Sequence, residues 1–150
     1  MISLLVLSAA PGIEDFAVRN TVQTMSFVLG VQAPAPGAPW NLLHVGTNDW
    51  IIVPDCTPLI PLVAMTVAMI SFPSTPGWRL LGIGLGAVVL WLFNVLRLVV
   101  LAWVERWMPA AASMVHIYLF QTFTFVLVCA LFVLWICLRP SGIPQRAGGR

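Results

Sequence analysis

Charged side chains are scarce in this sequence of 150 residues, and lysine is absent altogether. Only 8% of the residues are Asp, Glu, Lys or Arg, whereas 60% are hydrophobic, and the mean hydropathy is +0.98. An average soluble domain has about 25% charged residues. So little charge cannot keep the chain dispersed in water, but it suits a chain surrounded by lipid. The composition therefore excludes an ordinary soluble domain and predicts an integral membrane protein.

Cysteine is scarce as well, with only Cys56, Cys129 and Cys137 in the chain. Three cysteines cannot all pair, and the last two lie in one apolar run, so no disulfide framework follows. The formal net charge of +2 comes with arginines spread singly along the chain, which does not indicate a nucleic-acid partner. The sequence also lacks a nucleotide-binding glycine pattern. We expect neither a cofactor nor a metal.

Long apolar runs predict the membrane spans, because about 20 apolar residues cross the hydrocarbon core as a helix. The candidate spans are 13–30, 57–72, 80–104 and 117–138. Pro58 and Pro61 fall in the first turns of one span, where a missing amide hydrogen costs little. The first candidate has charged residues in its first half, so it either spans or lies partly in the interface. We expect one all-α membrane domain over 1–150, with about four transmembrane helices.

Arginines predict the orientation, since short loops rich in Lys or Arg stay in the cytoplasm. Arg79 lies between two candidate spans, and the tail 139–150 carries three more arginines. Both termini are then cytoplasmic, in the cytoplasmic (inner) membrane, and the apolar stretch 1–10 is interpreted as part of the mature chain. The segment 31–55 lies outside, and its residues 43–53 alternate enough to pair as a strand. Tryptophans fit this orientation at the outer boundary (Trp40, Trp50, Trp103, Trp107) and the inner one (Trp78, Trp135).

Three chemically distinctive residues fall at one predicted depth near the outer face. Cys56 begins the span 57–72, His116 begins the span 117–138, and Arg97 lies near the outer end of 80–104. Arg97 is six residues from Trp103, or about 9 Å along a helix, so its side chain can snorkel to the outer surface. The three side chains could converge without a large rearrangement.

The chemistry of these residues suits a cysteine nucleophile. A thiol at a helix N-terminus near His or Arg is readily deprotonated, and Cys56 would be the attacking group. His116 can take and return a proton near neutral pH. Arg97 can hold an oxyanion or a substrate carbonyl, and Asn94, one turn deeper on the same face, could orient Arg97 or donate a hydrogen bond of its own.

Each of these residues also has a structural interpretation. Cys56 could be a small apolar filler, as Cys129 and Cys137 are expected to be. An arginine within a span costs about 2.5 to 3.5 kcal/mol and tends to be functional, but Arg97 could also pair with Asp55 or Glu105. The chain would then be a noncatalytic four-helix subunit or scaffold of an envelope or secretion complex. A small transporter with an anion site is less favoured, because no paired half-helices are present.

The ordered set of motifs resembles the exosortase and archaeosortase family of membrane enzymes. The matching segments read P-D-C-T-P-L at Pro54 to Leu59, N-V-L-R at Asn94 to Arg97, and V-H-I-Y at Val115 to Tyr118. The resemblance covers roughly 20–139. This chain departs from many members in carrying Pro58 where they have glycine, which removes a backbone amide that could serve an oxyanion hole, and in being shorter at its N-terminus.

The resemblance implies a thiol protease or transpeptidase that processes the C-terminal sorting signals of exported proteins at the outer face of the cytoplasmic membrane. Such signals combine a short motif, a transmembrane helix and a basic end. The resemblance implies Cys56 as the nucleophile, with Arg97 and His116 as its partners. The acyl-enzyme would pass to an unidentified acceptor nucleophile or to water.

Overall fold

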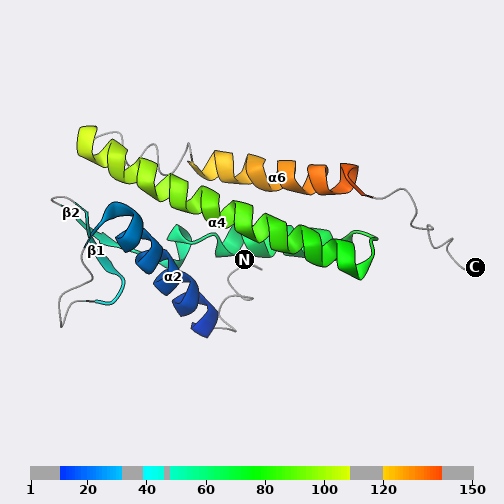
Figure 1. The fold of residues 1–150 in the computed structure, drawn as a ribbon, viewed down its shortest axis with the longest axis horizontal. Coiled ribbons are helices and arrows are strands. Elements are labelled where there is room, and N and C mark those ends of the chain that lie inside the picture. Colours follow the sequence, from blue (N-terminus) through cyan, green and yellow to red (C-terminus); the bar gives the residue numbers. More distant parts are fainter. Residues whose placement is uncertain (1–10, 32–38, 46–47, 109–119, 140–150) are drawn as a thin grey trace, which may run out of the picture.

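The computed structural model describes residues 11–31, 39–45, 48–108 and 120–139. Within these ranges the chain is mostly helical, with one short two-stranded sheet (Figure 1). The elements are, in chain order, α2 (Pro11–Leu29), β1 (Leu42–Val45), β2 (Asn48–Ile51), the 3-10 turn η1 (Pro54–Cys56), α3 (Leu59–Ser71), α4 (Pro76–Trp107) and α6 (Gln121–Cys137). The described part is thus a helical assembly with a small hairpin at one end.

Helix α4 is the central helix of this assembly, and α2, α3 and α6 all pack along it (Figure 1). The helix begins with Pro76 in its first turn, where the missing amide hydrogen is tolerated, and the amide of Met108 bonds to the carbonyl of Val104 at its end. Its buried residues recur every four positions: Gly82, Gly86, Leu90, Asn94, Leu98 and Ala102. Residues four apart lie nearly above one another, so these six form a continuous buried stripe that winds slowly around the helix and is covered by the neighbouring elements.

Two apolar clusters hold the assembly together. The first joins α2 and the hairpin to the C-terminal half of α4, and its buried members are Val18, Val22, Met25, Leu43, Ile52 and Leu98. The second joins α3 and α6 to the N-terminal half of α4, through Met65, Met69, Leu90 and Trp135. The turn that carries Cys56 lies where the two clusters adjoin, because Cys56 packs against the first and α3 follows directly after it.

The second cluster depends on close approach at two glycines of α4. A Cβ atom at Gly82 would collide with the indole of Trp135, and one at Gly86 would collide with the side chain of Met65, whereas Gly84 faces open space. Trp135 Nε1 donates to the carbonyl of Trp78 at 3.0 Å, and Trp78 Nε1 donates to the carbonyl of Trp135 at 3.4 Å. The start of α4 and the end of α6 are thus joined by a reciprocal pair of hydrogen bonds.

The hairpin differs from the single strand expected over 43–53. β1 and β2 pair antiparallel, with Val45 opposite Asn48 and Leu42 opposite Ile51. Leu43 and Ile52 are buried while His44, Asp49 and Ile51 are exposed, as the two faces of a half-buried sheet require. Alternation along the whole stretch concealed the reversal, because both strands follow the same period of two.

The helices match the apolar runs in position but not always in length. The predicted span 80–104 lies inside the longer α4, and 57–72 and 117–138 correspond to α3 and α6, of 13 and 17 described residues. The segment 13–30 is helical as α2. By length and composition, α4 is the one helix in the described ranges that is long and apolar enough to cross a membrane, and α3 and α6 are apolar but shorter. The expected count of four spans is therefore not confirmed.

Candidate functional site

Cys56 is the last residue of η1 and precedes α3 rather than beginning it. Its amide donates to the carbonyl of Val53 at 2.8 Å, and the amide of Thr57 donates to the carbonyl of Pro54 at 3.0 Å. Helix α3 starts three residues later at Leu59, after Pro58. The prediction that Cys56 lies at the helix N-terminus is wrong in this detail, because two prolines set a separate tight turn before the helix.

Asn94 joins this turn to α4. Its side-chain Nδ2 donates to the carbonyl oxygen of Cys56 at 2.9 Å, across 38 positions of sequence. Asn94 is only 5% exposed, so the bond is shielded from competing water. Of the two roles predicted for Asn94, the structure shows a hydrogen bond of its own, and this bond fixes the position of the cysteine backbone.

Arg97 lies one turn further along α4 and is half-buried. Its guanidinium group lies close enough to Cys56 and to Asp55 to interact electrostatically with both side chains. The structure therefore brings Arg97 near Cys56, as its predicted role requires, and also near Asp55, its predicted structural partner. His116 lies outside the described residues.

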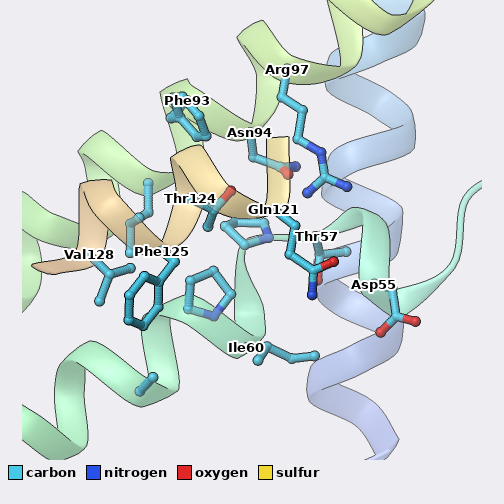
Figure 2. A pocket seen from close by; sticks show the side chains of 14 residues that line it. Asp55, Thr57, Ile60, Phe93, Asn94, Arg97, Gln121, Thr124, Phe125 and Val128 are labelled. Carbon is cyan, nitrogen blue, oxygen red and sulfur yellow. The ribbon is translucent and has the colours of Figure 1, made fainter. Parts of the chain in front are cut away.

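A pocket of about 550 Å³ opens beside the turn, between α3, α4 and α6. Figure 2 shows its polar end, where Arg97 from α4 and Gln121 from α6 lie near Asp55 and Thr57 from the turn. The rest of the lining is mostly apolar: Pro58, Ile60, Pro61, Ala64, Leu90, Phe93, Phe125 and Val128. The pocket thus joins a polar mouth at the level of Cys56 to an apolar interior one to two helical turns deeper.

The side chain of Cys56 is half-buried and packs against the apolar cluster beneath α2. Its neighbours Asp55 and Thr57 line the pocket, but Cys56 is not among the lining residues. The cysteine backbone is therefore held at the pocket, and its side chain packs against the apolar cluster. The apolar contact is what the filler interpretation of Cys56 requires.

Backbone donors for an oxyanion are few around Cys56. The amides of Cys56 and Thr57 are both used inside the turn, and Pro58 has none. Among the lining side chains, Arg97 carries a permanent charge and is therefore well suited to stabilise a negative oxygen in this pocket. The departure at Pro58 that the sequence shows thus increases the importance of Arg97.

Gln121 and Thr124 are pocket residues that the sequence interpretation did not assign. A signal was present, because both are polar residues in the apolar run 117–138 and their spacing of three places them on one helix face. The Thr124 hydroxyl donates to the carbonyl of Phe120 at 2.8 Å, so its donor is used within α6. Gln121 therefore contributes the amide group that α6 presents at the polar mouth.

The described residues contain no group of three or more His, Cys, Asp or Glu side chains able to hold a metal ion. Outside the pocket, His44 Nδ1 and Asp49 Oδ1 form a close pair across the hairpin. Comparison of the chain with protein-family models, curated proteins and solved structures gives no match. The resemblance to exosortases and archaeosortases stays a prediction that depends on the three motifs.

Proposed function

We propose that this chain is a membrane-embedded thiol protease or transpeptidase that cleaves exported proteins near a C-terminal sorting signal, at the outer face of the cytoplasmic membrane. The observation that carries the proposal is the hydrogen bond from Asn94 to the carbonyl of Cys56. It joins two of the three motifs that are 38 residues apart in sequence. Arg97, one helical turn further along α4, is thereby brought close to the cysteine.

Membrane embedding is supported by the surface of α4. The helix has 32 residues, or about 48 Å at 1.5 Å per residue, which exceeds the hydrocarbon thickness of about 30 Å. Only 22% of its most apolar window is buried inside the protein, whereas a core helix of a soluble protein is mostly buried. Large side chains such as Leu85, Leu92 and Leu96 are exposed on it. Surrounding lipid would stabilise this exposed apolar surface of α4.

Tryptophans support the same arrangement. Trp103 and Trp107, both 69% exposed, lie at the C-terminal end of α4 with their rings 6.2 Å apart. Exposed tryptophans gather at the level of lipid headgroups. In the proposed orientation this end of α4 is the outer one, and Asn94, which holds the Cys56 turn, lies about 14 to 20 Å below these tryptophans along the helix.

The proposed reaction begins with attack of Cys56 Sγ on the scissile carbonyl carbon. Arg97 donates hydrogen bonds to the oxygen as it becomes negative. His116 accepts the thiol proton and returns it to the leaving amine, so that a thioester remains on Cys56. An acceptor amine or hydroxyl, or water, then attacks the thioester and restores the thiol. The proposal requires Sγ to turn from the apolar cluster toward the pocket when substrate enters.

A substitution series tests the nucleophile. The substrate is an exported fusion protein that ends in a short motif, a transmembrane helix and a basic segment, and the measurement is its cleaved fraction in membranes at matched enzyme levels. We expect Cys56→Ala to abolish cleavage and Cys56→Ser to be nearly inactive, because a hydroxyl needs a stronger base than a thiol. Cys129→Ser and Cys137→Ser are the controls and retain activity. Normal cleavage by Cys56→Ala would refute the proposal.

A noncatalytic membrane subunit is the second candidate, and the packing of Cys56 against the cluster beneath α2 favours it. In that case Asn94 and Arg97 hold the turn on α4 and serve only the fold. The variant Cys56→Ala distinguishes the protease from the subunit, because it keeps a small apolar side chain in the cluster and removes the thiol. A noncatalytic subunit would still support its complex in this variant, whereas the protease would no longer cleave the tagged substrate.

A further inference from the structure

The hairpin leads directly to the candidate nucleophile. From Ile51, the last residue of β2, the chain continues through Ile52 and the extended Val53 into η1, and reaches Cys56 after five residues. Figure 1 shows the hairpin at the same end of the molecule as the C-terminal end of α4. One end of β2 therefore lies next to the site, and the other points away from it.

The backbone of β2 has one edge that does not pair with β1. Antiparallel pairs alternate between hydrogen-bonded and non-bonded positions. The amide of Ile52 donates to the carbonyl of Asn41 at 2.9 Å, so the bonded positions on this strand are the even ones. The N–H and C=O groups of Asp49 and Ile51 therefore point away from β1. In the described ranges, no hydrogen bond joins these groups to another segment.

Side chains keep this edge in place and accessible. On one face Leu43 and Ile52 are fully buried against α2 and α4, which anchors the hairpin. On the other face Ile51 is 59% exposed and Val53 is 41% exposed. The pair of His44 and Asp49 joins the strands near the tip of the hairpin. Among the described residues, the outer edge of β2 is thus an anchored row of unpaired backbone groups beside an exposed apolar face.

We propose that this edge binds the substrate by strand addition: the extended peptide on the N-terminal side of the scissile bond pairs in parallel with β2 and delivers its carbonyl to Cys56. The inference rests on the proposed function. The direction follows from the geometry, because a peptide that reaches Cys56 from the outer end of α4 runs the same way as β2. Main-chain hydrogen bonds then supply affinity, and the exposed Ile51 and Val53 contact alternate substrate side chains.

Peptide vinyl sulfones test this inference without knowledge of the sorting motif. The Cys56 Sγ–H adds across the activated double bond, with no leaving group, and the peptide part occupies the N-terminal side of the scissile position. A mixture of N-acetylated tetrapeptide vinyl sulfones is applied to the full-length protein in detergent, and intact-mass spectrometry measures labelling. Cys56→Ala is the blank. The best-labelling sequence is then remade with an N-methyl group at each amide in turn.

Strand addition predicts that the effect of N-methylation on the labelling rate alternates from one peptide amide to the next. Alternate N-methyl groups remove a bond to β2 and should slow labelling by about tenfold, and the others should change it less than about threefold. Ile51→Pro removes an outward N–H that β1 does not use, and should slow labelling of every peptide, whereas Ile51→Thr keeps that N–H and should not. Labelling of Cys56 without alternation would overturn strand addition alone. Absence of labelling by every probe would overturn the nucleophile and the inference with it.

Discussion

At the scale of single residues, the site depends on side chains that replace missing backbone donors. The Cys56 turn uses its own amides, and Pro58 supplies none, so Arg97 is the charged side chain of the pocket that can stabilise a developing negative charge. Asn94 serves differently, because its donor is already bonded to the Cys56 carbonyl. Under the proposed function Asn94 is a positioning residue and Arg97 a catalytic one.

Replacement of Arg97 by Lys tests whether the site needs only the positive charge or also the planar shape of the guanidinium group. Lysine keeps a positive charge but loses the planar fork that can hold a carbonyl oxygen with two donors. We expect Arg97→Lys to insert at near-normal levels and to reduce the cleaved fraction of a tagged substrate by about 100-fold, the usual effect of losing one oxyanion donor. Full cleavage at matched protein level would contradict the oxyanion role of Arg97.

Replacement of Asn94 by Leu removes the bond to the Cys56 carbonyl while keeping a side chain of similar size. The carbonyl would lose its partner in a buried setting, which costs about 1 to 3 kcal/mol. We expect a lower thermal midpoint in detergent and a lower rate of Cys56 alkylation or cleavage in Asn94→Leu. The matched control is Asn20→Leu, a half-buried asparagine on α2 away from the pocket. An equal loss in the control would assign the Asn94 effect to general destabilisation.

At the scale of elements, glycine sets how closely α4 approaches its neighbours. Gly82 and Gly86 lie on the buried face one turn apart, and Gly84 lies on the open face. The spacing of two along the sequence, Gly82, Gly84 and Gly86, conceals this division. The close contacts that Gly82 and Gly86 permit are with Trp135 and Met65 of the same chain.

Gly82→Ala tests this close approach. The added methyl group would collide with the Trp135 indole, which cannot move aside freely because its Nε1 donates to the carbonyl of Trp78. We expect destabilisation of about 1 to 3 kcal/mol, the usual cost of overpacking, seen as a lower unfolding midpoint in detergent. Gly84→Ala is the control, and it should be neutral or stabilising because alanine favours helix. Equal midpoints for the two variants would contradict the role of Gly82.

Sequence patterns predicted some elements well and others poorly, for physical reasons. Apolar runs located α3, α4 and α6 because hydrophobicity over many residues is a strong signal. The hairpin was predicted as one strand because alternation does not mark a reversal. The turn before α3 was missed because a proline fits both a helix start and a tight turn. The hydrogen bond between Asn94 and Cys56 agrees with the expected proximity of the two motifs, but the sequence could not show how the Cys56 side chain packs, and His116 lies outside the described residues.

At the scale of the whole molecule, the exposed apolar surface has to be covered. Cys129 and Cys137 are both exposed on α6, so nothing in the described protein shields them. Lipid would shield them in the proposed arrangement, whereas water would reach them in a soluble protein. Their reactivity therefore reports the surroundings of α6 directly.

A membrane-impermeant maleimide applied to intact spheroplasts should modify Cys56 and leave Cys129 and Cys137 unmodified. Detergent permeabilisation alone should not expose Cys129, because a micelle still covers α6, but denaturation should make all three reactive. Single-cysteine variants resolve the three sites by mass spectrometry. Reaction of Cys129 in intact membranes would place α6 in water, and reaction of Cys56 only after permeabilisation would reverse the orientation.

The reciprocal bonds between Trp78 and Trp135 fix the C-terminal end of α6 to the start of α4. They hold it to α4 at the end away from the pocket, while Gln121 lies at the opposite end, at the polar mouth. The helix is about 25 Å long, from 17 residues at 1.5 Å each. A tilt of about 10° around the tryptophan pair would therefore move Gln121 by about 4 Å. Such a tilt would widen the pocket at Gln121 and keep the tryptophan bonds, but it would loosen the packing of Leu127 and Val128 against the second cluster.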